Sequence, residues 1–188
     1  KLTCLLMTST LIITATISGC ANNGLESVST KRQSIISMRN IALEDLYKAK
    51  PKTRKYISDA PGYGVFSNAN VNVIFASFSG GYGVVTNNKV KGNTYMKMAE
   101  AGIGFGLGLK DYRTIFVFHD KETMKNFVDN GWVFGVHADA AAKAGKNGGA
   151  LGSELVLDGI TVYQLTESGL ALQATVKGTK YWKADDLN

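Results

Sequence analysis

Two short glycine-aromatic motifs are the first candidates for a site that does chemistry. GYGVFSN occupies residues 62–68 and GYGVVTN occupies residues 81–87. Glycine-rich loops cradle phosphates when they follow a strand and open a helix, as in the pattern G-x-G-x-x-G. Here Ser67 and Thr86 stand where the third glycine would be, and both motifs continue into β-branched and aromatic residues, which favour strands. The motifs therefore predict two related strands of one sheet rather than two nucleotide-binding loops.

The histidines and carboxylates give little support for catalysis or metal binding. His137 and Asp139 fall on the same face of an expected strand, which suits a weak metal pair or an oriented base. A zinc site normally needs three or four ligands, and no cysteine or second nearby histidine supplies them. The sequence also contains no G-x-S-x-G or H-E-x-x-H motif. We therefore expect no catalytic residues, no metal and no cofactor, and a hydrolase centred on His137 is the weakest hypothesis.

The first residues predict a different chemistry, the covalent attachment of lipid. Lys1 precedes an uncharged, largely apolar run that ends in the sequence ISGC, whose last residue is Cys20. A short apolar run between a positive charge and small residues is typical of a secretory signal. ISGC resembles the lipobox of bacterial lipoproteins, in which the cysteine thiol is acylated, for example with palmitate. We therefore expect a lipoprotein signal peptide over residues 1–19 and an acylated tether over residues 20–27. An ordinary secretory signal with an incidental cysteine is the alternative.

Positive charge is concentrated soon after this segment. The formal net charge is +6; residues 31–55 hold eight basic and two acidic residues, whereas residues 56–188 hold twelve of each. A polybasic segment beside a lipid anchor attracts anionic headgroups, by about 1 kcal/mol per Lys or Arg near the surface. Nucleic acid is the usual alternative partner, but an exported protein rarely meets it. The predicted headgroup-binding residues are Lys31, Arg32, Arg39, Lys48, Lys50, Lys52, Arg54 and Lys55.

Helices at the start of the chain must position these basic residues. Between Ser27 and Lys48 the apolar residues recur at helical spacing, which predicts one amphipathic helix that ends near Pro51. A second, shorter helix is predicted over residues 52–59, before a Pro-Gly pair breaks the pattern.

From residue 62 onward, glycine-punctuated runs of β-branched and aromatic residues predict consecutive strands. A helix over residues 120–130, capped by Asp120, is the one predicted interruption. Short connections favour an antiparallel sheet curled into a sandwich or barrel. We therefore predict the α+β class, with N-terminal amphipathic helices packed on a Gly-rich, mainly antiparallel sheet in a single domain over residues 28–188. Beyond the two opening motifs, the strand-like segments are residues 71–79, 94–110, 113–118, 131–144, 154–166 and 170–176.

Four alternating glycines in AGIGFGLGLK would occupy one face of the strand predicted over residues 94–110. A face without side chains loses packing and raises the entropy cost of ordering the backbone, so something must approach it closely. Aromatic side chains or a helix laid across the face are one explanation, and a lipid chain or headgroup in a groove is the other. The glycines concerned are Gly102, Gly104, Gly106 and Gly108.

Several runs together resemble the SYLF-domain family, which includes the yeast actin-patch regulator and bacterial lipid-binding lipoproteins. The likeness covers about residues 40–183, and its most specific part is the Gly-alternating strand followed by an aspartate-aromatic pair and an apolar strand. It implies a lipid-binding module to which a basic amphipathic segment before the core contributes, with phosphoinositide binding in eukaryotic relatives. The runs are APGYGVFSN, the GGYG that follows, MAEAGIGFGLGLKDYRTIFVF, FVDNGWVFG and GLALQATVKGTKYW.

Taken together, these features predict a non-enzymatic lipoprotein of the bacterial cell envelope that binds anionic phospholipid or lipopolysaccharide. Ala21 stands where an Asp would retain an enteric lipoprotein in the inner membrane, so we expect the inner leaflet of the outer membrane, facing the periplasm. A protein-interaction module, either actin-binding-like or an envelope scaffold, is the alternative function. It would use the same basic face on an acidic protein.

Overall fold

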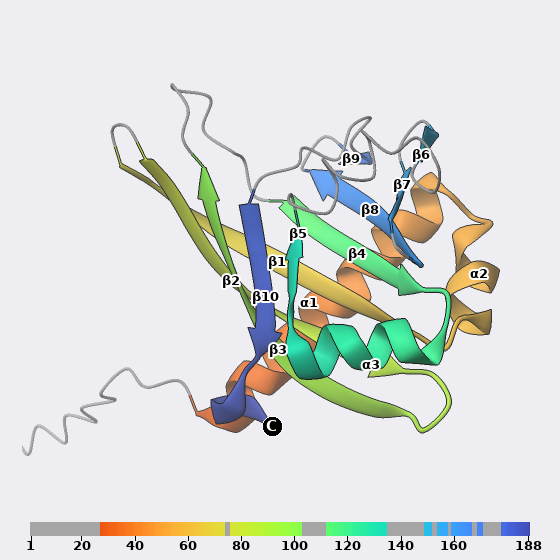
Figure 1. Ribbon diagram of the computed structural model, residues 1–188, viewed down its shortest axis with the longest axis horizontal. Helices are drawn as coiled ribbons and strands as arrows, with labels where there is room; N and C mark the ends of the chain where they lie inside the picture. Colours follow the sequence, from red (N-terminus) through yellow and green to blue (C-terminus); the bar gives the residue numbers. More distant parts are fainter. Residues whose placement is uncertain are drawn as a thin grey trace, which may run out of the picture.

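A computed structural model describes most of the predicted domain (Figure 1). Cys20, His137 and Asp139 lie outside the described residues, as do the predicted signal peptide and Gly104, Gly106 and Gly108. The described residues are 27–73, 76–102, 112–134, 149–151, 154–157, 159–166, 169–170 and 178–188.

Two helices precede the sheet, as predicted. Helix α1 spans Val28–Ala49 and helix α2 spans Thr53–Asp59. Ser27 caps α1, because its Oγ accepts a hydrogen bond of 3.2 Å from the Thr30 N–H. One apolar stripe of α1 is buried, which is why the helix lies on the sheet. The stripe consists of Ile35, Ala42, Leu43 and Leu46.

The described strands form a single 10-stranded sheet in which every pairing is antiparallel. The sheet is strongly twisted and curls into an open half-barrel (Figure 1). The α+β prediction is therefore confirmed. The strands are β1 (Gly62–Val73), β2 (Ala76–Asn87), β3 (Gly92–Gly102), β4 (Tyr112–Phe118), β5 (Trp132–Phe134), β6 (Gly149–Leu151), β7 (Glu154–Leu157), β8 (Ile160–Thr166), β9 (Gly169–Leu170) and β10 (Gly178–Lys183).

Spatial order in the sheet differs from sequence order. The strands run β5-β10-β3-β2-β1-β4-β8-β7-β6, with β9 beside β8. Strand β10, which the sequence reading did not predict, therefore lies between β5 and β3. A short 3-10 helix, η1 (Asp185–Leu187), follows β10 and packs against α1.

The strand predicted over residues 71–79 is wrong, because this stretch contains the end of β1 and the start of β2. Val73 pairs with Ala76, so the chain reverses between them. Only Ile74 and Phe75 separate these two partners, and neither is a typical turn residue, so the apolar composition hid the hairpin.

The two opening motifs lie in neighbouring antiparallel strands, β1 and β2, where Phe66 pairs with Gly83 and Asn68 pairs with Gly81. A Cβ at Gly83 would lie 2.3 Å from the Phe66 ring, so glycine is required for this close approach. The strand interpretation is therefore confirmed and the phosphate-loop alternative is excluded.

Helices cover both faces of the sheet. Helix α3 (Lys121–Asn130) lies in front of the strands in Figure 1, and α1 runs behind them. Alternate side chains of a strand point to opposite faces of the sheet. Val65 packs under α1 and α2, whereas Phe66 packs toward α3. The α3 side is mainly aromatic, with the Phe66 and Tyr181 rings 4.7 Å apart, centre to centre, in an edge-on arrangement.

The predicted helix over residues 120–130 is confirmed as α3, and its cap is the expected one. Asp120 accepts a 2.7 Å hydrogen bond from the Thr123 N–H and a second from the Thr123 hydroxyl. These hydrogen bonds lower the pKa of the Asp120 carboxyl. The helix buries Met124 and Phe127 against the aromatic layer.

Candidate functional site

The eight predicted headgroup-binding residues fall into two groups, one on α1 up to Arg39 and the other from the C-terminal end of α1 into α2. At a rise of about 1.5 Å per residue, Lys31 and Lys48 are separated by about 26 Å along the helix. The basic residues therefore do not form one continuous patch. The N-terminal basic group is Lys31, Arg32 and Arg39, and the junction basic group is Lys48, Lys50, Lys52, Arg54 and Lys55.

The N-terminal basic group fastens α1 to the rest of the protein. Lys31 Nζ lies 3.8 Å from the centre of the Tyr82 ring on β2. Arg32 Nε donates a 2.8 Å hydrogen bond to the Leu187 carbonyl of η1. Arg39 donates to the Thr86 hydroxyl at 3.0 Å and to the Asn93 side chain at 3.2 Å. These three cations therefore have structural partners.

Two members of the junction basic group are also engaged. The Arg54 guanidinium lies 3.3 Å from a Glu44 carboxylate oxygen and 4.2 Å from the centre of the Tyr47 ring. Lys50 Nζ lies 5.3 Å from the centre of the Tyr163 ring. Both side chains thereby help to join α1, α2 and the sheet.

The remaining members, Lys48, Lys52 and Lys55, are exposed. Lys48 pairs with Asp45 at 3.6 Å and Lys55 pairs with Asp59, each within its own helix. Exposed pairs of this kind contribute only about 0.3–0.5 kcal/mol, so these ammonium groups can exchange their partners for another anion. Among the described residues, the Lys52 side chain has no hydrogen bond or ion pair. We call Lys48, Lys52 and Lys55 the exposed lysine triad.

A half-exposed tyrosine accompanies the exposed lysine triad on α2. The Tyr56 hydroxyl lies 3.0 Å from the Thr161 hydroxyl of β8, and His119 Nε2 lies 2.8 Å from the same oxygen. The Tyr56 and His119 rings meet edge-on at 6.3 Å. This contact ties α2 to the sheet and fixes the orientation of the lysines that α2 carries. His119, one of the two histidines, is thus placed in a structural contact.

A buried polar cluster inside the half-barrel was missed by the sequence reading. Glu100 on β3 is 4% exposed, and the Tyr112 hydroxyl of β4 donates a hydrogen bond to it. Strands β3 and β4 are separated in the sheet by β2 and β1, so this hydrogen bond spans the inside of the half-barrel. Burial raises the pKa of the Tyr112 hydroxyl, and the nearby Tyr181 and Glu100 raise it further. The alternation of Met96, Met98 and Glu100 could have revealed that this carboxylate faces the core.

Of the four alternating glycines, Gly102 lies among the described residues, whereas Cys20 lies outside them. Gly102 ends β3 opposite Ser77, and the next three alternating glycines lie outside the described residues. Within the described ranges, no cluster of three or more His, Cys, Asp or Glu residues could hold a metal ion. No helix in the same part of the chain combines the length and the apolar character needed to cross a bilayer.

Comparison with known proteins connects this fold to a family. Residues 99–188, from the end of β3 through η1, match the family model described as "Ysc84: Las17-binding protein actin regulator". The chain is also 34% identical over 159 residues to "Beta cell expansion factor A" of Aeromonas veronii. That similarity covers 83% of this chain and 58% of the relative's length. The resemblance read from the sequence motifs is thereby confirmed over residues 99–188, which match the model of the Ysc84, or SYLF-domain, family.

Proposed function

We propose that this protein is a non-enzymatic lipid-binding module that meets an anionic bilayer surface through the exposed lysine triad. The observation that carries the proposal is the placement of Lys48, Lys52 and Lys55 at the α1–α2 junction, with side chains in solvent and only weak partners. The ligand is the headgroup of an anionic phospholipid or of lipopolysaccharide. The match of residues 99–188 to the SYLF-domain family model supports this class of ligand.

The proposal limits the predicted headgroup-binding site to part of the eight basic residues. Lys31, Arg32 and Arg39 bind to β2, β3 and η1, so their charges are already matched to tyrosine rings, a carbonyl and polar side chains. In the exposed lysine triad, Lys48 and Lys55 have only exposed carboxylate partners within their own helices, which an anionic headgroup can replace. We therefore assign headgroup binding to the triad, with Lys50 and Arg54 holding the junction in shape.

A lipid anchor at Cys20 would act together with the exposed lysine triad. The anchor precedes α1, whereas the triad begins at its far end, about 30 Å away along a helix of 22 residues. If both ends meet the same bilayer, α1 lies nearly parallel to the membrane plane. Acylation confines the protein to the membrane, and the lysines set its orientation and select anionic lipid. We place the protein on the periplasmic face of the outer membrane.

Vesicle co-sedimentation tests the assignment of the exposed lysine triad. A soluble form that begins at Ala21 keeps every described residue and removes the anchor. It should sediment with phosphatidylglycerol-containing vesicles, much less with pure phosphatidylcholine, and less as salt is raised. Replacing the triad by Gln should weaken binding about 100-fold, at about 1 kcal/mol per lysine.

The matched control removes the same charge elsewhere. Lys125, Lys180 and Lys183 are also exposed and lie on α3 and β10, away from α2, and their triple Gln variant should bind nearly as well as the parent protein. Salt-insensitive retention on both kinds of vesicle would contradict the proposal. An equal loss of binding in the two triple variants would show that binding depends on the net charge of the protein and not on the position of the exposed lysine triad.

Binding to an acidic protein is the second candidate, favoured by the Las17-binding description of the family model. The same exposed lysine triad would then meet carboxylates instead of phosphates. Pull-downs from envelope extracts, with the parent protein and with the triad replaced by Glu, distinguish the two functions. A partner captured in the absence of lipid and lost on charge reversal would favour this alternative.

A further inference from the structure

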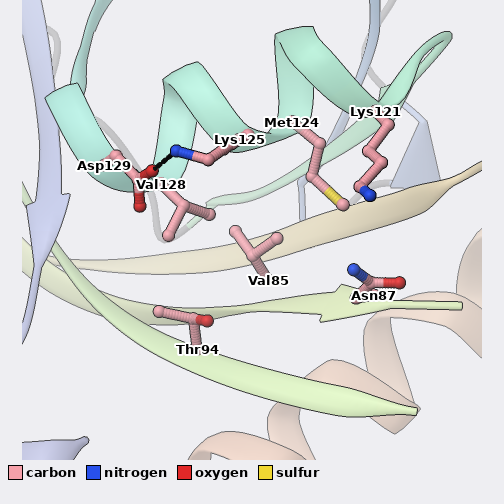
Figure 2. A pocket seen from close by; sticks show the side chains of 8 residues that line it. All are labelled: Val85, Asn87, Thr94, Lys121, Met124, Lys125, Val128 and Asp129. Atoms are coloured by element: carbon pink, nitrogen blue, oxygen red, sulfur yellow. Dashed lines mark hydrogen bonds and ion pairs between the residues drawn. The ribbon is translucent and has the colours of Figure 1, made fainter. Parts of the chain in front are cut away.

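Helix α3 and the strands β2 and β3 enclose a half-open groove of about 180 Å³ on the face of the sheet opposite α1 (Figure 2). We propose that this α3 groove binds a single-chain carboxylate amphiphile, an n-alkyl acid of about six to eight carbons. At about 30 Å³ for each water-sized group, the volume accommodates about six methylene-sized groups. The residues that line it are Val85, Asn87, Thr94, Lys121, Met124, Lys125, Val128 and Asp129.

The middle of the α3 groove is apolar. Val85 on β2 and Met124 on α3 are buried core residues, and Val128 is partly buried against the same core. Figure 2 shows these three side chains between the helix and the strands, along the length of the groove. A hydrocarbon chain that binds along these side chains is removed from water, and this removal of apolar surface from water favours binding.

The two ends of the groove differ in charge, and this difference gives a ligand its direction. At one end Lys125 forms an ion pair with Asp129, so its charge is neutralised on the same helix. At the other end the Lys121 side chain has no hydrogen bond or ion pair among the described residues, and its ammonium group and the Asn87 amide lie at the same end of the groove in Figure 2. An anionic head is therefore complementary to the Lys121 end.

The preceding residue, Asp120, forms no ion pair with Lys121. The Asp120 carboxylate instead accepts two hydrogen bonds of 2.7 Å, one from the N–H and one from the hydroxyl group of Thr123. A carboxylate ligand would thus find a free ammonium, an amide donor and an adjoining apolar channel in one line. A neutral alcohol of the same length would use only the channel, and acetate would use only the charged end.

This inference goes beyond the proposed function and does not depend on it. The α3 groove is lined by α3, β2 and β3, whereas the exposed lysine triad lies on α1 and α2, across the sheet. Loss of vesicle binding and loss of ligand binding in the groove can therefore be measured separately.

Titration with octanoate below its micelle-forming concentration, followed by calorimetry and amide NMR shifts, tests the proposal. The purified protein should bind one octanoate saturably, with shifts confined to α3, β2 and β3. Octanol should bind about 10-fold more weakly, and acetate should not bind measurably. Lys121→Gln should weaken octanoate binding about 10-fold while leaving octanol binding unchanged. Val128→Phe should fill the channel and abolish the binding of both.

Lys180→Gln removes the same charge from an exposed position on β10 and should bind octanoate like the parent protein. Far-UV spectra and thermal midpoints show whether each variant is folded, and Lys121→Gln changes only an exposed side chain. The proposal is overturned if octanoate does not bind. It is also overturned if octanoate binds equally well to the parent, Lys121→Gln and Val128→Phe proteins, which would indicate adsorption elsewhere.

Discussion

The packing between β1 and β2 leaves no room for a Cβ atom at Gly83. A Cβ at Gly83 would lie 2.3 Å from the Phe66 ring and 2.4 Å from the Val65 carbonyl oxygen. Gly83→Ala should therefore lower the free energy of unfolding by about 1–3 kcal/mol, as overpacking does, in urea denaturation. Gly80→Ala on the same strand is the control, because its nearest contact is an ordinary 3.9 Å. Equal stability of the two variants would show that the sheet can relax around the added methyl group.

Two buried tyrosines predict sensitivity to alkaline pH. Burial raises the pKa of both the Tyr112 and the Tyr181 hydroxyl, and Glu100 raises both further. Above a pH of about 10 the unfolded chain loses these protons while the folded protein retains them, so stability falls as pH rises. Each tyrosine contributes about 1.4 kcal/mol per pH unit to that slope.

Urea midpoints measured from neutral to strongly alkaline pH test this prediction. Tyr112→Phe should reduce the alkaline slope by the contribution of one tyrosine, whereas Tyr95→Phe removes a hydroxyl outside the cluster and should keep the parent slope. A Tyr112→Phe protein with an unchanged slope would show that this hydroxyl ionises without unfolding.

At the residue scale, sequence reasoning found the Asp120 cap of α3 but not the Glu100–Tyr112 pair. Caps depend on residues three positions apart, as with Asp120 and Thr123, and such spacing is visible in the sequence. The Glu100–Tyr112 pair joins strands that are not neighbours in the sheet. Only the curl of the sheet brings these two residues together.

At the scale of elements, α1 is held mainly by its buried stripe. Leu46, on the buried side of α1, is 0% exposed, whereas Ile41 on the same helix is 51% exposed. Leu46→Ala should lower the free energy of unfolding by about 2–5 kcal/mol, because it removes methyl groups and leaves a cavity. Ile41→Ala should change stability by less than about 0.5 kcal/mol in the same urea experiment. Similar losses in both variants would mean that Ile41 is covered in solution.

Helices were predicted from the sequence more accurately than hairpins. The residues bounding α1, α2 and α3 carry periodic apolar positions, a cap or a terminating proline, all of which act locally. The β1–β2 reversal has no glycine, proline, Asn or Asp between Val73 and Ala76, so no local signal marks it. Strand β10 was missed because its partners, β3 and β5, lie far away in the sequence.

At the scale of the whole molecule, the proposed membrane orientation makes the native tryptophans informative. The protein has two Trp residues, Trp132 on β5 and Trp182 on β10. In the strand order β5 and β10 come first, whereas β8, to which α2 is tied through Tyr56, lies near the other end. Trp132 also packs against the aromatic layer on the α3 side, whereas α2 packs on the other face of the sheet. A membrane reached through α2 therefore leaves both indoles in the protein or in water.

Quenching by brominated anionic lipid tests this orientation. Vesicle binding should leave the fluorescence of Trp132 and Trp182 essentially unchanged, whereas an added Tyr56→Trp indole should be quenched. Strong quenching of the native tryptophans together with an unquenched Tyr56→Trp indole would show that another face meets the membrane.

The hydrogen bond from Arg32 to Leu187 joins residues 155 positions apart. A ribosome delivers the chain in order, so α1 emerges long before η1, whose N-cap residue Ala184 and last residue Leu187 share a buried cluster with Ile35. Until residue 187 has been synthesised, that end of α1 has no complete surface to cover its apolar stripe. During translation the nascent chain therefore stays incompletely folded, with the apolar stripe of α1 exposed to water or to a chaperone until η1 has been synthesised.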